Sequence, residues 1–362
     1  MKSFLLILTC LFLLNTSYAK DITFKVSKGG NLDAALNVGS IKVYVWNKDE
    51  VKITIDDDEA SNLKTSSSGN TVKVNYNPNN TGSGDDLTIT IPSSFNVKMM
   101  TNAGDVIIEG NLEGNVNINT AGGEVKAGDI KGDAKIFTGG GDVNIGSIGS
   151  GNISSAGGDI KLKNVEKDVL VKCSGGDIVV ENVNNSADLN TAGGSILLNF
   201  AGGNSNITTG GGNINIGKLQ KKSSVNTAGG DVNIKSAGGE LLIQVASGDI
   251  IINDLIGSVK AKTLGGDIKV NIGKNYKGFS YFSTVSGNVH SVVSPDANVK
   301  VNVKMKKNNF YSEDDFKESI KSEYKLNSIN KSGIYIEASF SVNQGNNGVS
   351  YELNNGEVYI KK

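Results

Sequence analysis

The sequence contains no arginine, and among its 362 residues it has one histidine, two cysteines and three prolines. Without a guanidinium group the chain cannot bind phosphate or carboxylate in the bidentate mode. The single histidine, His290, excludes a histidine-rich metal site, and we interpret it as a solvent-facing side chain on a late strand. Aromatic residues make up only 6% and no basic block is present, which argues against nucleic-acid binding.

The first nineteen residues have the pattern of a secretory signal peptide. Lys2 supplies the positive start, the run from Phe4 to Leu14 is apolar, and Ser17-Tyr18-Ala19 places small residues at the cleavage subsites. We therefore expect cleavage before Lys20 and export to the periplasm, the cell surface or the medium. A retained membrane anchor is disfavoured because the apolar run is well short of the ~20 residues that a spanning helix requires.

The two cysteines do not predict a disulfide. A lipoprotein site at Cys10 is disfavoured because Thr9 precedes it and the apolar run continues past it. Cleavage then leaves Cys173 as the single cysteine, so no disulfide can form within one chain and stability must come from packing. No second apolar run is long enough to span a membrane.

What the sequence does contain is a Gly-Gly-Asp-Ile/Val phrase that returns about every 18 residues. Seven of the ten intervals between the second glycines are 18 residues, and the others are 17, 19 and 21. A fixed period of this length predicts one structural unit stacked on itself. The marker glycines are Gly104, Gly123, Gly141, Gly158, Gly176, Gly194, Gly212, Gly230, Gly248, Gly266 and Gly287.

Apolar residues fall into columns when the repeats are aligned on these glycines. They recur at offsets 2, 4, 7, 11, 13 and 15, and the alternation within offsets 2–4 and 11–15 predicts two short strands in each turn. One turn buries too little apolar surface to offset the entropy of ordering its backbone, so the turns must stack. We therefore predict an all-β fold, a single-stranded parallel β-helix or solenoid with about 18 residues per turn, capped at both ends.

The repeat divides the chain into three parts after the signal peptide at 1–19. Residues 20–95 form a β-rich capping region and the first turns, with Trp46 as its expected anchor, and residues 96–290 form the regular solenoid. Residues 291–362 form a β-rich C-terminal cap. Within it, Phe316, Ile320 and Tyr324 recur at four-residue spacing and predict a short charged helix.

The column directly after the marker glycines is mostly acidic. Stacked carboxylates about 4.8 Å apart repel one another, and a divalent cation such as calcium would relieve that repulsion. Alternatively, Asp, Asn and Ser side chains accept hydrogen bonds from the turn backbone, which also accounts for the neutral residues in the column. We favour the turn interpretation, expect no other cofactor, and retain as candidate metal ligands Asp142, Asp159, Asp177, Asp231, Asp249 and Asp267.

Two further motifs have structural explanations that we prefer. Offset 15 is a threonine column that also admits Val245 and Cys173, so we interpret Cys173 as a small buried residue and not as a reactive thiol. The stretch from Gly212 to Leu219 resembles a phosphate-binding loop. Leu219 stands where that loop needs a hydroxyl for magnesium, so this likeness is a by-product of the repeat.

Taken in order, several phrases resemble the bacterial putative-adhesin β-strand-repeat family. They are Gly39-Ser-Ile-Lys-Val, Leu87-Thr-Ile-Thr-Ile-Pro92, the run of glycine turns and Asn355-Gly-Glu-Val-Tyr-Ile, and together they span most of residues 30–362. The resemblance implies a right-handed parallel β-helix at the cell envelope. It implies no catalytic residues, and the function of that family is largely undefined.

We expect a noncatalytic exported β-solenoid that serves as an adhesin or an envelope scaffold. Its partner would be a cell-surface, glycan or envelope component, and self-association is left open. The alternative is a carbohydrate-active enzyme, either a polysaccharide lyase or a hydrolase, because such enzymes also use parallel β-helices. The uniform turns between Gly104 and Gly266 leave little room for the loops of an enzyme groove. A carboxylate pair in a cleft, apart from the regular column, would favour the enzyme.

Overall fold

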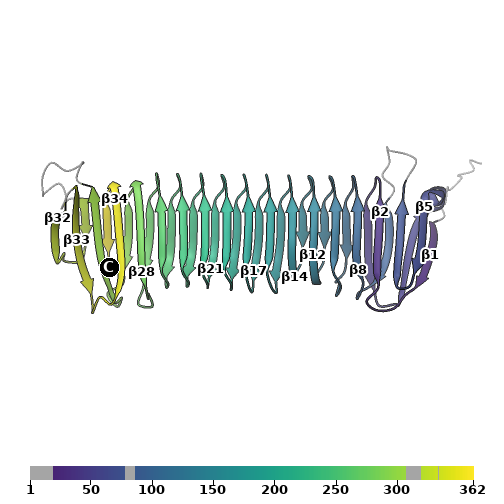
Figure 1. Cartoon of the computed structure of the whole chain (residues 1–362), viewed down its shortest axis with the longest axis horizontal. Coiled ribbons are helices and arrows are strands. Elements are labelled where there is room, and N and C mark those ends of the chain that lie inside the picture. Colours follow the sequence, from purple (N-terminus) through teal and green to yellow (C-terminus); the bar gives the residue numbers. More distant parts are fainter. Residues whose placement is uncertain (1–18, 78–85, 307–318, 333) are drawn as a thin grey trace, which may run out of the picture.

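The computed structural model describes residues 19–77, 86–306, 319–332 and 334–362. Its regular structure consists of β-strands, with a 3-10 helix, η1 (Asp57–Asn62), near the N-terminal end. The strands are arranged side by side in a long rod (Figure 1). No helix in the described part of the chain is long and apolar enough to cross a membrane.

Two rows of paired strands run the length of the rod, and in its regular part the chain alternates between them. We call them the first and the second sheet, although a single pair, Ile148↔Val165, connects them. Each strand of the regular part pairs in parallel with the strand two further on. For example, β16 (Val169–Cys173) pairs with β18 (Ala187–Thr191) in the register Val169↔Ala187. In the same way, β17 (Ile178–Val183) pairs with β19 (Ile196–Ala201) in the register Ile178↔Ile196. The predicted all-β, mostly parallel fold is confirmed.

In spatial order from the N-terminal end, the first sheet contains β5 (Leu63–Ser68), β6 (Thr71–Tyr76), β2 (Asn31–Leu36), β8 (Asn96–Thr101), β10 (Val116–Thr120), β12 (Ile130–Thr138), β14 (Ile148–Ser155), β16 (Val169–Cys173), β18 (Ala187–Thr191), β20 (Ser205–Thr209), β22 (Ser223–Thr227), β24 (Leu241–Val245), β26 (Val259–Thr263), β28 (Phe279–Ser286), β34 (Asn347–Asn355), β30 (Val299–Lys306), β33 (Tyr335–Val342) and β32 (Ser328–Ser332).

The second sheet contains, in the same direction, β1 (Ala19–Lys25), β4 (Glu50–Asp56), β7 (Leu87–Pro92), β3 (Ile41–Trp46), β9 (Val106–Glu109), β11 (Val125–Ala127), β13 (Val143–Ile145), β15 (Ile160–Val165), β17 (Ile178–Val183), β19 (Ile196–Ala201), β21 (Ile214–Leu219), β23 (Val232–Ala237), β25 (Ile250–Leu255), β27 (Ile268–Ile272), β29 (Val289–Val293), β35 (Val358–Lys361) and β31 (Ile320–Ser322).

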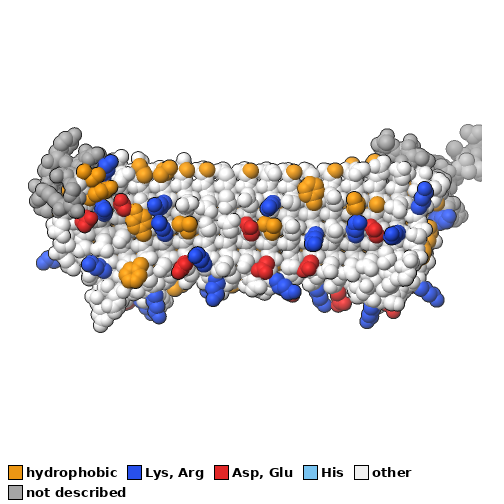
Figure 2. Space-filling model, viewed as in Figure 1, with side chains coloured by type: hydrophobic (Ala, Val, Ile, Leu, Met, Phe, Trp, Pro, Cys, Tyr) orange, Lys and Arg blue, Asp and Glu red, His pale blue; other side chains and the backbone are white. Residues whose placement is uncertain are grey.

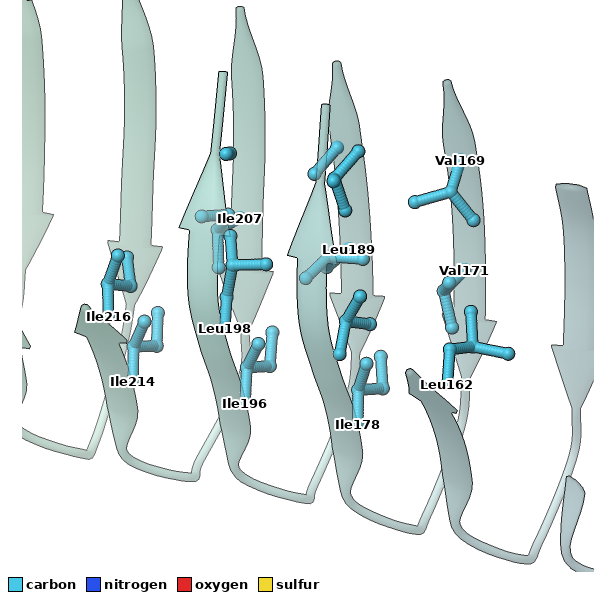
Figure 3. Close-up of a cluster of buried hydrophobic side chains, with 14 of the residues drawn as sticks. Leu162, Val169, Val171, Ile178, Leu189, Ile196, Leu198, Ile207, Ile214 and Ile216 are labelled. Atoms are coloured by element: carbon cyan, nitrogen blue, oxygen red, sulfur yellow. The ribbon is translucent and has the colours of Figure 1, made fainter. Parts of the chain in front are cut away.

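The core lies between the two sheets and is built from the apolar columns of the repeat. Alternate residues of each strand are buried, as in β18 and β24, because successive side chains of a strand point to opposite faces. Ile196 and Leu198 of β19 are fully buried, and they face Ile207 of β20, which is also fully buried, across this core (Figure 3). Such β-branched and leucine side chains repeat from turn to turn, so one apolar core runs along the rod.

The marker glycines stack where the chain approaches itself too closely for a side chain. A Cβ placed on Gly212 would lie 2.1 Å from the carbonyl oxygen of Gly194 in the preceding turn. The threonine column completes this corner: Thr209 Oγ1 donates a hydrogen bond of 2.6 Å to Gly194 O and accepts one of 3.2 Å from Gly212 N–H. Each hydroxyl therefore joins two successive turns.

At the N-terminal end the coil is interrupted by an insertion. β2 and β3 form its first turn, and the next turn along the rod is β8 and β9, so paired residues such as Leu32 and Val97 are far apart in sequence. Strands β6 and β7 cover the other side of β2 and β3, and antiparallel β5, β4 and β1 complete the end. Trp46 is partly buried and its Nε1–H donates a hydrogen bond of 2.8 Å to Glu50 O, whereas Tyr76 and Phe95 are the large fully buried aromatic residues here; its role as an anchor stays a prediction.

At the C-terminal end the order of strands in space differs from their order in the chain. Strands β34 and β35 form the turn that follows β28 and β29, and β30 lies beyond β34, as the yellow strand among green ones shows (Figure 1). Of the expected charged helix the structure describes only the end: Ser319 is helical, and Ile320 starts strand β31, which pairs in parallel with β35. The start of that helix, including Phe316, lies outside the described residues.

Candidate functional site

From Asp142 onward the acidic column forms a continuous ladder of hydrogen bonds between turns. Asp231 Oδ1 accepts a hydrogen bond of 2.8 Å from the backbone N–H of Asp249, and Asp249 Oδ1 does the same for Asp267. The other candidate metal ligands, Asp142, Asp159, Asp177 and Asp267, make equivalent bonds of 2.7–2.9 Å to the next turn.

Neutral residues take the same role in this ladder. Asn213 Oδ1 accepts from Asp231 N–H at 2.8 Å, and Ser195 Oγ accepts from Asn213 N–H at 3.2 Å. The geometry thus favours the turn interpretation of the column, since an amide or a hydroxyl serves as well as a carboxylate. In the described part of the chain, no group of three or more His, Cys, Asp or Glu side chains could hold a metal ion. Calcium binding by the column stays the untested and less favoured alternative.

Cys173 occupies a threonine position in the interior column. It is buried, and its Sγ lies 3.1 Å from the carbonyl oxygen of Gly158 and 3.1 Å from the backbone nitrogen of Gly176. These are the two contacts that a threonine hydroxyl makes in other turns. A thiol placed in this way is engaged with the backbone and shielded from solvent, which agrees with its interpretation as a packing residue.

His290 lies on β29 and is partly exposed. Its ring stacks on Tyr359 of β35, with centroids 4.6 Å apart and an angle of 9° between the planes, and its Nε2 lies 3.8 Å from Asp267 Oδ2. Tyr359 and Lys321 both contact Glu357, and the ammonium group of Lys321 is the main reason that the pKa of Glu357 is lowered. These contacts fasten β31 and β35 to the rod.

A cavity of about 500 Å³ lies on the outer face of the first sheet at the C-terminal end. Its floor is a row of five residues in register across five strands. Four of them are small and polar, and the fifth is a tyrosine. We call this site the C-terminal trough, with the floor residues Ser328, Ser339, Asn302, Ser350 and Tyr281.

The trough exists because taller side chains flank this row. One wall is the next row on the same strands, with Lys304 in register between Glu337 and Glu352. Lys304 Nζ lies 3.9 Å from Glu337 Oε1 and 4.2 Å from the centroid of the Tyr335 ring. Lys300 lines the opposite side. Pairs of lysine and glutamate thus surround a floor of hydroxyl and amide groups.

Tyr281 is the floor residue at one end of the trough, where the trough meets the next cavity. Its hydroxyl donates a hydrogen bond to Glu352 Oε2, and Lys262 Nζ lies 5.8 Å from its ring centroid. Partial burial and the hydrogen bond with the Glu352 carboxylate raise the pKa of Tyr281, which favours the protonated phenol that donates this bond. Beyond Tyr281, a second cavity of about 340 Å³ continues across β26, β24 and β22.

Phe279 lies on the same face of β28 as Tyr281, lines the second cavity where it meets the trough, and has 76% of its surface exposed. Its partner in register is Gly348, and a Cβ placed on that glycine would lie 2.7 Å from the ring. The glycine therefore lets the ring of Phe279 lie against the backbone of β34. One face of the ring is supported and much of it is open to solvent.

Sequence reasoning missed this trough because its strands lie far apart in the chain. β28, β30, β33 and β34 become neighbours only through the reordering at the C-terminal end. A local signal was present in residues 279–284, where alternation places Ser280 and Phe282 in the core. The same alternation points Phe279 and Tyr281 outward, although aromatic residues are scarce in the regular turns.

The fold and this outer surface define a class of elongated all-β proteins with two mostly parallel sheets. A family model described as Toastrack DUF4097 matches residues 14–205 and 168–336. These matches together cover most of the chain, and the protein belongs to this family. No protein among the curated ones matches it.

The solved structures that resemble this chain include three proteins whose names refer to adhesion. A putative adhesin from Bacteroides fragilis is 17% identical with a TM-score of 0.31, and the alignment covers 77% of this chain and 97% of that protein. A putative adhesin from Parabacteroides distasonis is 9% identical, with a TM-score of 0.30 and coverages of 76% and 98%. A putative cell adhesion protein from Clostridium sporogenes is 10% identical, with a TM-score of 0.16 and coverages of 95% and 98%. Likenesses this distant carry no information on function.

Proposed function

We propose that this protein is an exported, noncatalytic β-solenoid that acts as an adhesin or as a binding scaffold of the cell envelope. In this proposal the coil is a right-handed parallel β-helix with about 18 residues per turn. Residues 20–95 and 291–362 cap the regular part at 96–290. Removal of residues 1–19 would release the chain to the periplasm, the cell surface or the medium.

The observation that supports binding is the C-terminal trough on a rigid rod. Its floor and walls come from paired strands, which hold side chains in place better than loops do. Elsewhere the side chains at the corners of the coil are hydrogen-bonded to the backbone of a neighbouring turn, as Thr209 and Asp231 are, so they are already engaged within the fold.

Charges of both signs are interspersed over the face seen in Figure 2, so no single-sign field dominates that face.

Two experiments test the proposal. The full-length chain is expressed and the cells are fractionated; we expect a processed protein beginning at Lys20 in an envelope or extracellular fraction. Purified residues 20–362 are then tested for binding to cells, glycans and isolated envelope material. Retention of the unprocessed chain in the cytoplasm would refute export, and binding to none of these materials would refute the adhesive function.

A carbohydrate-active enzyme is the second candidate, because a carboxylate pair does lie in a cavity. Glu337 and Glu352 are placed on either side of Lys304, so their α-carbons are roughly 10 Å apart at the usual strand spacing. Two carboxylates across a sugar-binding cleft are the machinery of glycoside hydrolysis. Here Lys304 separates the pair and Tyr281 holds Glu352, an arrangement that suits binding.

A cleavage assay separates the two candidates. A panel of polysaccharides is incubated with the protein, with and without calcium, and reducing ends or unsaturated products are measured. We expect no turnover. Turnover that is lost in both Glu337→Gln and Glu352→Gln would establish the enzyme and reverse our order of preference.

A further inference from the structure

We propose that the C-terminal trough binds a neutral oligosaccharide chain, with Phe279 and Tyr281 as stacking platforms. The inference rests on the adhesive function proposed above and names its site and the chemical class of its ligand. Four properties of the trough support it: the aromatic rims, the polar floor, the balance of charge and the direction in which the trough runs.

The exposure of Phe279 has no explanation in the fold. A phenylalanine gains stability by leaving water, yet this ring lies on the surface over Gly348 and remains 76% exposed. A flat ring supported on one face offers its other face to a flat apolar surface. The C–H face of a pyranose ring is such a surface, and it carries hydroxyl groups around its edge.

The aromatic residues also cluster at this end of the rod. Between residues 96 and 275 the sequence has only Phe137 and Phe200, whereas Phe279, Tyr281 and Tyr335 all lie at or beside the trough. Tyr281 presents a ring whose hydroxyl is already engaged by Glu352. Rigid aromatic side chains with a polar edge are efficient contact residues, because little conformational entropy is lost on binding.

The floor offers hydrogen-bond donors and acceptors in one row. The hydroxyl groups of Ser328 and Ser339 bond to each other at 2.8 Å and keep further capacity to accept, Ser350 contributes another hydroxyl, and Asn302 contributes a carbonyl oxygen and an amide. Sugar hydroxyls both donate and accept, so a row of this composition matches them. An apolar lipid tail would leave Ser350 and Asn302 without partners, which costs free energy.

The charges around the trough favour a ligand without net charge. Lys300 and Lys304 are balanced by Glu337 and Glu352, and Lys304 lies 3.9 Å from Glu337. An anionic polymer would gain from the two lysines but would meet the two carboxylates. The absence of arginine also removes the side chain best suited to carboxylate and sulfate groups.

The trough runs across the strands, and its length suits a linear chain. The floor row crosses five strands, which at about 4.8 Å per gap gives roughly 19 Å. Past Tyr281 the second cavity continues in the same direction over Lys260 and Leu242. A chain of several sugar units would therefore follow the rod axis, with Phe279 and Tyr281 near its middle.

The test measures binding by calorimetry to purified residues 20–362. Probes are cello- and chito-oligosaccharides, length-matched alginate and heparin fragments, and vesicles of phosphatidylcholine with phosphatidylglycerol. Variants are Phe279→Ala and Tyr281→Ala, with Phe137→Ala as the matched control, since Phe137 is an exposed aromatic residue on β12 away from the trough. Thermal unfolding checks that each variant is folded; the exposed Phe279→Ala should be within about 0.5 kcal/mol of the parent.

We expect a neutral oligosaccharide to bind, Phe279→Ala and Tyr281→Ala each to weaken binding about tenfold, and Phe137→Ala to leave it unchanged. Equal loss in the Phe137 variant, or no loss in the trough variants, would overturn the site. Binding of only the anionic fragments or only the vesicles would overturn the ligand class.

Failure of the inference can be told apart from failure of the proposed function. If no oligosaccharide binds but envelope material still binds to the parent protein, the adhesive function stands and the glycan assignment is wrong. If neither binds, both are wrong.

Discussion

Val245 lies beside Thr227 in register on the neighbouring strand and lacks the hydroxyl that Thr227 uses twice. Thr227 Oγ1 donates to the carbonyl oxygen of Gly212 at 3.1 Å and accepts from Gly230 N–H at 3.2 Å. The side chain of Val245 can make neither bond, although the corner around it has the same form. Two neighbouring turns therefore differ at this position, where one has a hydroxyl group and the other a methyl group.

Val245→Thr should stabilise the rod, because the new hydroxyl enters a corner already shaped for it. We expect a gain of about 1 kcal/mol in the free energy of unfolding, measured by chemical denaturation. The reverse change, Thr227→Val, should cost at least as much, since it leaves buried backbone groups without partners. A loss of stability in Val245→Thr would show that the corner of that turn cannot accommodate a hydroxyl with the two hydrogen bonds that Thr227 makes.

Gly212→Ala should be severely destabilising, whereas the adjacent Gly211→Ala should be tolerated. A Cβ on Gly212 would lie 2.1 Å from the backbone oxygen of Gly194, while a Cβ on Gly211 would find its nearest atom at 3.6 Å. We expect a loss of about 3 kcal/mol for the first and less than about 1 kcal/mol for the second, from thermal and chemical unfolding. Equal effects would contradict the close stacking of the marker glycines.

Asp231→Asn should have little effect and Asp231→Ala should cost about 1 kcal/mol, because an amide oxygen can still accept the hydrogen bond from Asp249 N–H. Removal of divalent cations with a chelator should leave the melting temperature of the parent unchanged. A calcium-dependent rise in that temperature, lost in Asp231→Asn, would instead establish the cation hypothesis, since a ligand of the native state stabilises it.

The fold should lose stability at alkaline pH through Tyr276. Burial raises the pKa of Tyr276 from 10.0 to about 12, and its hydroxyl donates to Gly348 O at 2.7 Å. The folded state thus favours the protonated phenol, so this stabilisation is complete below pH 10 and is lost as the pH rises toward 12. Burial also raises the pKa of Tyr351, which acts in the same direction.

Tyr276→Phe is the check on that alkaline dependence. The melting temperature of the variant should be lower at neutral pH, because the bond to Gly348 is gone, and should fall less steeply between pH 10 and 12. An unchanged alkaline slope would assign the effect to other tyrosines.

Much of the fold follows from local alternation, and much of the trough does not. In strands such as β3 and β6 alternate residues are buried, as the local alternation of apolar and polar residues predicts. The sequence around Gly356 repeats the glycine phrase, and in the structure Gly356 does stack on Gly287 as the marker glycines of the regular turns do. By contrast, the short run around Ile320 has helical spacing, yet pairing with β35 makes it a strand. Non-local pairing of this kind leaves no trace in the spacing of residues.

The placement of β34 sets an order of events for folding. Residues 347–355 are synthesised after residues 299–306, yet β34 lies between β28 and β30 and pairs with both. Strand β30 can pair with β33 earlier, but its pairing is incomplete until β34 has emerged, and the trough cannot assemble before then. If the chain is exported from its N-terminus as proposed, this end would stay unfinished until nearly all of it had crossed, and the proposed binding site would form only on the far side.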